Sequence, residues 1–261
     1  MTKIIAICNR KGGVGKTTST INIAASLNLK KKKVLVIDLD PQANLTQSLG
    51  VTEKQATENN IYEALFNVYE PKPIEIIKGL FVIPSTLDLA GAESDLLKDI
   101  THCHFYLKDL IDEIKHNYDY VLIDCLPSLG LLVANAFVAA DEILIPVQSE
   151  YMATQGLNEL FDLIGKVKKI LNPSIEVGGL FMTRYDNRKT LNKAIFNYIK
   201  EEYPDKIFIT KIRDNVAISE SSLSKIDIFR YNSKSHGAED YQELTNEIIK
   251  RHKNDKSKKT S

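Results

Sequence analysis

The chain has 261 residues, of which 43% are hydrophobic and 26% are charged, a composition that excludes an intrinsically disordered protein. Its 34 basic and 34 acidic residues give a formal net charge of zero, which excludes a uniformly basic protein. Any contact with a nucleic acid would therefore have to come from a local basic patch. No apolar run is long enough to cross a membrane, and three cysteines without CxxC spacing predict reduced thiols in a cytosolic protein.

Short apolar runs rich in β-branched residues alternate with longer amphipathic segments. The runs are continuous, which is typical of strands buried on both faces of a parallel sheet. This alternation predicts a doubly wound α/β fold with a mostly parallel sheet and helices on both faces. The expected strands are residues 4–8, 34–37, 80–83, 120–123, 143–147, 177–182 and 207–209. The expected helices are residues 17–29, 89–97, 105–116, 131–140, 156–171, 191–203 and 238–250.

The segment NRKGGVGKTT, residues 9–18, lies between the first expected strand and the first expected helix. This is the context of a phosphate-binding loop. Glycines let successive main-chain N–H groups point into one concavity, and the helix N-terminus adds partial positive charge. Lys16 is expected to contact the β- and γ-phosphates, and the Thr17 hydroxyl to bind Mg²⁺. The predicted ATP-binding residues are Lys11, Gly12, Gly13, Val14, Gly15, Lys16, Thr17 and Thr18.

Carboxylates follow two of the expected strands. Asp38 comes directly after residues 34–37, and Asp124 directly after residues 120–123. Ligands of open α/β sheets bind at the carboxyl ends of strands, so both side chains are expected beside the phosphate loop. Asp124 is expected to hold Mg²⁺ through a water molecule, because this ion releases water reluctantly.

The motif KGGVGKTT departs from the strict GxxxxGK(S/T) pattern, because Arg10 occupies the first glycine position and a second lysine, Lys11, is present. It resembles the deviant Walker A motif of the ParA/MinD group of ATPases. By that resemblance, Lys11 crosses a dimer interface to the partner's phosphates and acts there as an arginine finger does. The sequence DLDPQ at 38–42 resembles the family's switch I, in which Asp40 orients or deprotonates the attacking water and Asp38 helps to form the magnesium shell.

The resemblance covers most of residues 1–247 and points to the ParA/Soj branch, which segregates plasmids or chromosomes. The loop DCLPSLG resembles switch II, with Leu126 where the family usually has proline. Arg213 and Asn215 belong to a segment that packs on the adenine in the family. Further matching segments are IPVQSEY at 145–151, TRYDNR at 183–188 and RYNSKSHGAEDY at 230–241.

Members of this branch bind DNA without sequence specificity as ATP dimers, because basic side chains displace counterions from phosphates. Ala217 stands where the family often has a basic residue. The resemblance implies ATP and Mg²⁺ as cofactors, slow intrinsic hydrolysis, a ParB-type centromere-binding partner, no membrane, and a cytoplasmic, nucleoid-associated location. The residues expected to form one basic face are Arg184, Arg188, Lys189 and Lys193, with Lys211 and Arg213 in a later loop.

One ATPase domain is expected over residues 1–252, with a polar loop at 50–60. Residues 253–261 hold four lysines and no apolar residue, which predicts a disordered tail.

Two other functions of the same group stay open. A MinD-type cell-division ATPase that binds membrane needs bulky apolar residues on a C-terminal amphipathic helix, and residues 250–261 contain no Leu, Ile, Phe or Trp. An Fe-protein-like, ATP-driven reductase needs paired thiolates for an Fe–S cluster, which the positions of Cys8, Cys103 and Cys125 disfavour. A small-molecule ligase or kinase would need a substrate site that no motif indicates.

Overall fold

The computed structural model describes residues 2–66, 71–149 and 153–259. Within these residues an eight-stranded sheet has the order β3-β4-β2-β5-β1-β6-β7-β8. Neighbouring strands are parallel except for the antiparallel pair β3–β4 at one edge, which confirms the expected α/β fold. The strands are β1 (Lys3–Ile7), β2 (Val34–Leu39), β3 (Ile74–Ile77), β4 (Leu80–Ile83), β5 (Tyr120–Cys125), β6 (Glu142–Gln148), β7 (Glu176–Tyr185) and β8 (Ile207–Arg213).

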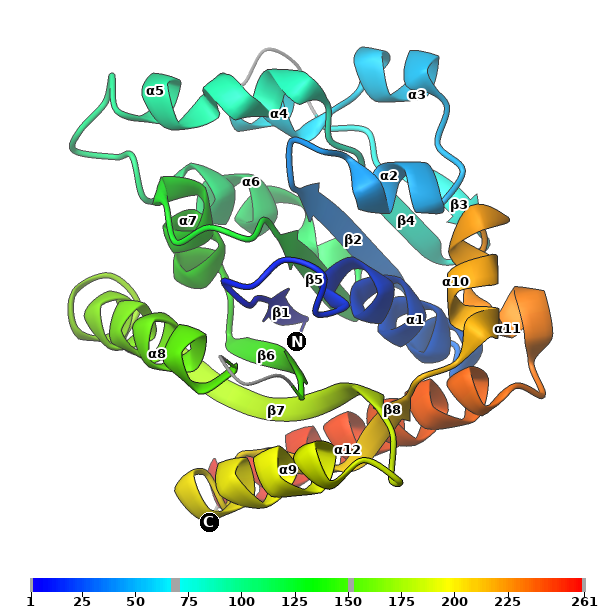
Figure 1. The fold of residues 1–261 in the computed structure, drawn as a ribbon. Coiled ribbons are helices and arrows are strands. Elements are labelled where there is room, and N and C mark those ends of the chain that lie inside the picture. Colours follow the sequence, from blue (N-terminus) through cyan, green and yellow to red (C-terminus); the bar gives the residue numbers. More distant parts are fainter. Residues whose placement is uncertain (1, 67–70, 150–152, 260–261) are drawn as a thin grey trace.

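Helices cover both faces of this sheet (Figure 1). The helices are α1 (Lys16–Leu29), α2 (Asn44–Ser48), α3 (Glu53–Glu58), α4 (Ile61–Leu65), α5 (Ala92–Leu96), α6 (Tyr106–Ile114), α7 (Leu131–Ala139), α8 (Ala153–Ile170), α9 (Thr190–Glu202), α10 (Val216–Leu223), α11 (Ile228–Asn232) and α12 (His236–Lys259). Two 3₁₀ turns, η1 (Leu87–Gly91) and η2 (Lys115–Asn117), precede α5 and follow α6. No helix within the described residues is long and apolar enough to span a bilayer.

The sheet separates two hydrophobic cores. Ile4 and Ala6 of β1 belong to the core that includes side chains from α5, α6, α7 and α8. Ile5 and Ile7 belong to the core that includes side chains from α1 and α12. Successive side chains of a strand point to opposite faces of the sheet, so the continuous apolar runs of the sequence supply both cores.

Several short elements were not predicted. Helix α3 lies inside the expected loop at 50–60, where Thr52 and Gln55 form a capping box that stabilises a helix start. Strand β3 is a short, partly buried edge strand and therefore lacks the continuous apolar signal. Lys211 and Arg213 were expected in a loop, but both lie in β8, whose register with β7 extends to the pair Tyr185 and Arg213.

The last helix also differs from the expectation. Helix α12 continues to Lys259, so residues 253–259 are helical where a disordered tail was expected. The segment contains no glycine or proline, and lysine is a good helix former. Extending an existing helix avoids the cost of nucleating a new one.

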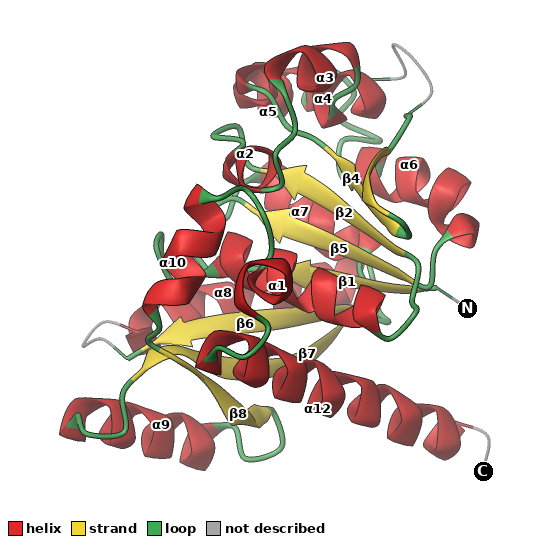
Figure 2. Cartoon of the chain, turned by 90° about the vertical axis from the view of Figure 1, so that its right-hand side faces the viewer, coloured by secondary structure: helices red, strands yellow, loops and turns green. Residues whose placement is uncertain are grey.

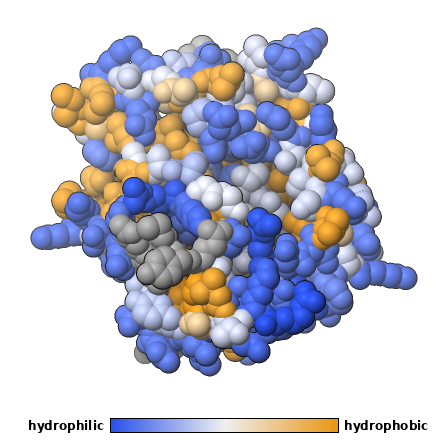
Figure 3. Space-filling view, in the orientation of Figure 1, coloured by the Kyte–Doolittle hydropathy of each residue, from blue (hydrophilic) through white to orange (hydrophobic). Residues whose placement is uncertain are grey.

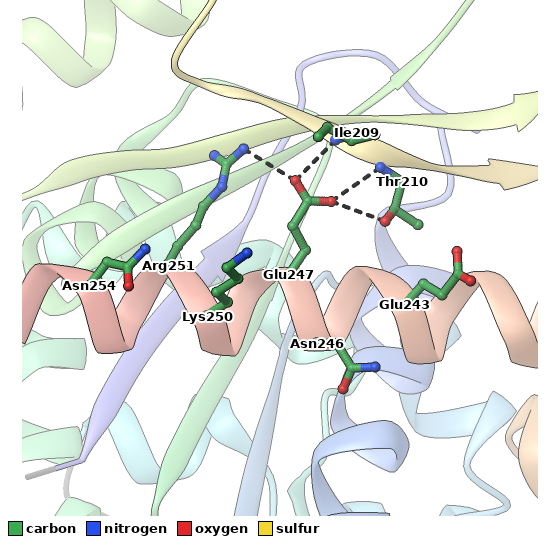
Figure 4. Close-up of a pocket in the computed structure, with 8 residues that line it drawn as sticks. All are labelled: Ile209, Thr210, Glu243, Asn246, Glu247, Lys250, Arg251 and Asn254. Atoms are coloured by element: carbon green, nitrogen blue, oxygen red, sulfur yellow. Dashed lines mark hydrogen bonds and ion pairs between the residues drawn. The ribbon is translucent and has the colours of Figure 1, made fainter.

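Helix α12 covers the edge strand β8 (Figure 4). The Glu247 carboxylate accepts hydrogen bonds from the main-chain N–H groups of Ile209 and Thr210, at 3.0 and 3.1 Å. It also accepts one from the Thr210 hydroxyl at 3.0 Å, and Arg251 lies 3.5 Å away. These residues line a hollow of about 500 Å³. Glu247 accepts the hydrogen bonds of two N–H groups at the free edge of β8. An edge strand whose N–H groups are bonded in this way is less able to pair with a strand of another chain.

Candidate nucleotide site

The phosphate loop connects β1 to α1 at the carboxyl end of the parallel strands (Figure 2). Gly13 and Gly15 have φ angles of 75° and 87°, which place both in the left-handed region where a side chain would be strained. Gly15 is the N-cap residue of α1 and has no Cβ to obstruct the helix N-terminus. The loop geometry therefore depends on glycine at both positions, as expected of a cradle for phosphate oxygens.

Hydrogen bonds to the neighbouring strands β6 and β7 fix the position of this loop. The Asn9 side-chain amide donates to the carbonyl of Pro146 in β6 at 2.8 Å, and its oxygen accepts from the Lys11 N–H at 3.0 Å. The Thr183 hydroxyl of β7 donates to the Val14 carbonyl at 2.8 Å. Asn9 and Thr183 belong to the motifs at 9–18 and 183–188, but their contacts with Pro146 and Val14 link residues that are far apart along the chain.

Lys16 and Thr17 are the first two residues of α1, and their side chains contact the phosphate loop and Asp124, respectively. The Lys16 ammonium is largely buried and donates to the Lys11 carbonyl at 3.1 Å. The Thr17 hydroxyl donates to Asp124 Oδ2 at 2.7 Å, and the Thr20 hydroxyl donates to Asp124 Oδ1 at 3.2 Å. The structure thus brings together the loop lysine, the hydroxyl and the carboxylate that were predicted from separate motifs. Thr20 was not predicted, although it lies one helical turn from Lys16.

The two strand-end carboxylates are buried neighbours. Asp38 and Asp124 are register partners on the adjacent strands β2 and β5. Burial, together with the nearby charge of Asp38, raises the pKa of Asp124 to about 8. Burial raises the pKa of Asp38 to about 6, although hydrogen bonds from Thr46 oppose this shift. Two adjoining buried carboxylates favour a cation between or beside them, because it offsets their desolvation.

The oxygen donors at this site suit magnesium. Thr17 and Asp124 supply a hydroxyl and a carboxylate within hydrogen-bond distance of each other, and Mg²⁺ prefers such hard ligands. Asp38 makes a different set of contacts, since its Oδ2 accepts from the Thr46 N–H at 2.9 Å and hydroxyl at 2.6 Å. Asp38 therefore fixes the start of α2 as well as placing negative charge near Asp124. Thr46 was missed in the sequence because nothing marks it locally.

Asp40 lies in the turn that leads from β2 to α2. Its Oδ1 accepts from the Gln42 N–H at 2.9 Å, and its carbonyl accepts from the Ala43 N–H at 2.9 Å. The side chain is only partly buried. Asp40 is thus held at the rim of the nucleotide site by local hydrogen bonds, a position compatible with contact to water.

The first part of the phosphate loop, residues 10–13, contacts α8 through Arg10. Arg10, the residue in the first glycine position of the motif, forms an ion pair with Glu159. Lys11 is half-buried, and Gly12 and Gly13 are exposed. Glu150 and Tyr151, which belong to a family-like segment, lie outside the described residues. The role of Lys11 in a partner subunit stays a prediction.

The expected basic residues gather around the ends of β7 and β8 and the start of α9. Arg188 donates to both carboxylate oxygens of Asp186 at 3.0 Å, and Arg184 lies 3.7 Å from Asp214. The Lys211 ammonium stacks over the Phe196 ring, 3.7 Å from its centre. Lys189 is the N-cap residue of α9, and Lys193 lies on its first turns.

Arg213 makes the strongest internal contacts of this group. Its guanidinium donates to Asp240 Oδ1 at 2.6 Å and to Glu239 at 2.6 Å. Asn215 caps α10 by accepting from the Ala217 N–H at 2.9 Å. The predicted contacts of Arg213 and Asn215 with adenine stay predictions, since both side chains have structural partners in the chain.

The three cysteines are all buried in one hydrophobic core. Cys8 and Cys125 lie at the ends of β1 and β5, and the contact between their side chains is the largest cause of a raised pKa of Cys125. Cys103 belongs to the segment between α5 and α6. The described structure thus presents these thiols to the core rather than to the surface.

Proteins of known name are similar in sequence to this chain. A family model described as an AAA domain matches residues 2–177. The sporulation initiation inhibitor protein Soj of Bacillus subtilis is 43% identical over 253 residues, covering 95% of this chain and 98% of that protein. The chromosome partitioning protein ParA of Myxococcus xanthus is 40% identical over 255 residues, covering 95% of this chain and 88% of that protein.

Solved structures are similar to this chain over nearly its whole length. Cobyrinic acid a,c-diamide synthase from Mycobacterium smegmatis, with bound ADP and magnesium, matches with a TM-score of 0.85 at 31% identity, covering 97% of this chain and 96% of that one. A putative plasmid partition protein from Borrelia burgdorferi, bound to AMPPNP, matches with a TM-score of 0.81 at 28% identity, covering 98% of this chain and 100% of that one. The resemblance seen in the sequence is confirmed, and the chain belongs to the Soj/ParA family of P-loop ATPases.

Proposed function

We propose that this protein hydrolyses ATP to drive the partition of a plasmid or chromosome. The observation that carries the proposal is the contact between Thr17 and Asp124 at 2.7 Å, beside a glycine-supported loop that bears both Lys11 and Lys16. The identity of 43% to Soj over nearly the whole chain favours partition over the amide synthesis named for the 31% identical structure.

The chemistry assigned to the site follows from its side chains. The loop N–H groups and Lys16 bind the β- and γ-phosphates of ATP, and Thr17 and Asp124 would hold Mg²⁺. The ion, when bound, neutralises charge that develops between the β- and γ-phosphates. Asp40 orients the attacking water. Asp38 would help to form the magnesium shell, and its contacts with Thr46 fix the start of α2.

A dimer completes this site in the proposal. Lys11 of each subunit reaches the phosphates of its partner and offsets charge on the transferred γ-phosphoryl group. Intrinsic hydrolysis is therefore slow, since the catalytic geometry is assembled only in the complex. A ParB-type protein stimulates turnover and returns the subunits to monomers.

DNA binds to the dimer without sequence specificity in this cycle. The contacts come from the basic residues near β7, β8 and α9, and they involve phosphates rather than bases. This role places the protein on the nucleoid in the cytoplasm.

The test measures DNA binding with ATP, with ADP and without nucleotide, each at two salt concentrations. We expect retention on DNA only with Mg²⁺ and ATP, and a steep loss at higher salt because counterion release dominates. Nucleotide-independent DNA binding, or ATP-dependent binding to lipid vesicles without any binding to DNA, would contradict the proposal. A coloured, iron-containing preparation would instead favour the reductase.

A further inference from the structure

Helix α7, which follows switch II, receives its N-terminal cap from another helix. Its own N-cap residue is Gly130, which offers no side chain. Glu93 of α5 fills this role, because its Oε1 accepts a hydrogen bond from the Leu132 N–H at 3.2 Å. The first N–H groups of a helix lack internal acceptors, and negative charge there also interacts favourably with the helix dipole.

Glycine at position 130 makes room for this contact. The Gly130 backbone has φ −85° and ψ −166°, a conformation open to any L-residue, so backbone strain does not require glycine. A Cβ at this position would lie 2.9 Å from Cδ of Glu93 and 3.0 Å from its Oε2, closer than side chains pack. An alanine at 130 would therefore displace the Glu93 carboxylate.

Packing holds Glu93 firmly against α7. Ala92 and Leu96 on either side of it are fully buried, in the same core as Leu132 and Val133 of α7. Leu97 and Ile100, which follow α5, are exposed, and Figure 3 shows apolar side chains gathered at the upper left, where Figure 1 draws the loop after α5. Helices α5 and α7 thus form one packed unit that reaches the molecular surface.

We propose that Glu93 is a positioning residue for switch II. Residues 126–130 connect Asp124, which is bonded to Thr17, to the start of α7, which is bonded to Glu93. Both ends of the loop are therefore fixed, and its motion is confined to the residues between them. The inference rests on the proposed function, since it concerns the rate at which the bound ATP is hydrolysed.

Four variants of the full-length protein test this role: Glu93→Ala, Glu93→Gln, Gly130→Ala and the double variant Glu93→Ala with Gly130→Ala. Glu93→Ala should lower kcat by about twofold to thirtyfold, the range for losing one cap, while ATP affinity stays within about twofold. Glu93→Gln should keep the wild-type rate, because an amide oxygen accepts the same hydrogen bond. Gly130→Ala should match Glu93→Ala, and the double variant should be no worse, since the added Cβ then has space.

Hydrogen exchange separates this inference from the proposed function. The N–H groups of Leu132 and of the loop residues 126 and 128–130 should exchange faster in Glu93→Ala than in the wild type, with or without turnover. Unchanged exchange at these groups, an unchanged kcat in Glu93→Ala, or additive losses in the double variant would overturn the inference. A wild-type protein that hydrolyses no ATP would overturn the proposed function, and the exchange rates would then still decide the role of Glu93.

Discussion

The nucleotide site and the basic region beside β7 and β8 differ in whether their ionisable side chains have partners of opposite charge. At the nucleotide site, Asp38 and Asp124 are buried together and receive their hydrogen bonds from hydroxyl and amide groups. In the basic region, Arg188 and Arg213 are paired with carboxylates of the same chain. In the first region burial disfavours the ionised form of both carboxyls, and a bound cation would stabilise it, whereas in the second region nearby carboxylates already compensate much of the positive charge.

This difference predicts two modes of binding. The side chains of the nucleotide site are already arranged for a cation, whereas a ligand of the basic region must displace carboxylates from its arginines. Mg²⁺ bound at the nucleotide site would meet carboxyls whose pKa values are raised by burial, so the ion would stabilise their ionised forms. DNA phosphates approaching the basic region must compete with Asp186, Glu239 and Asp240 for the same guanidinium groups. We therefore expect large mutational effects at the first region and small, salt-dependent effects at the second.

The largest effect is expected for Lys16→Ala, which tests the preorganised side of the comparison. Removing a buried cation from the phosphate loop should weaken ATP binding by at least about a hundredfold, since charged hydrogen bonds to phosphate disappear with it. Calorimetric titration with Mg-ATP measures this effect. Lys54→Ala, at a lysine of α3 whose side chain is 82% exposed, is the matched control and should bind like the wild type. Equal ATP affinity in the two variants would contradict the role of the loop.

Local sequence patterns were sufficient for the parts of the molecule that depend on local chemistry. Continuous apolar runs predicted every strand of the parallel part of the sheet, because burial on both faces demands such runs. The phosphate loop was equally clear, since positive φ angles at Gly13 and Gly15 require glycine at fixed spacing. The edge strand β3 and the short α3 carry weaker signals, because partial burial and side-chain capping leave little periodicity.

Contacts between distant residues were beyond the sequence. The pairing of Thr183 with the phosphate loop joins residues 169 positions apart, and that of Thr46 with Asp38 needs the turn between β2 and α2. The compensation of Arg213 by Asp240 also depends on how α12 packs on β8. The carboxylate partners of Arg188 and Arg213 therefore could not be read from the number of basic residues in the sequence.

Arg213→Ala sharpens the comparison by testing whether this arginine serves the fold. The partner Asp240 is only 5% exposed, and removing the guanidinium leaves a buried carboxylate without its main cation. We expect a loss of roughly 1–3 kcal/mol in the free energy of unfolding, less than for a fully buried pair because Arg213 is 37% exposed. Arg188→Ala is the control, since its side chain is 91% exposed and its pair with Asp186 should add no measurable stability. Equal denaturant midpoints for the two variants would show that Arg213 is not structural.

The smallest effects are expected for the two members of one ion pair, whose substitutions should change the affinity for DNA in opposite directions. The variants are Arg188→Glu and Asp186→Asn. Arg188 lowers the pKa of Asp186 to about 2 through their hydrogen bonds, so Asp186 is ionised and competes with DNA phosphates at neutral pH. If Arg188 contacts DNA, Arg188→Glu should weaken ATP-dependent DNA binding by about tenfold at low salt, whereas Asp186→Asn should strengthen it by about threefold.

The salt dependence of DNA binding distinguishes a direct contact between Arg188 and a DNA phosphate from an effect of the protein's net charge. The slope of log K against log salt should become shallower by about one in Arg188→Glu if the wild-type arginine neutralises one phosphate. Lys54→Glu, on α3 away from this region, controls for net charge. DNA affinity that follows net charge alone, equally in Lys54→Glu and Arg188→Glu, would place the DNA-binding surface elsewhere. Weaker binding in Asp186→Asn would show that the carboxylate orients Arg188 rather than competing for it.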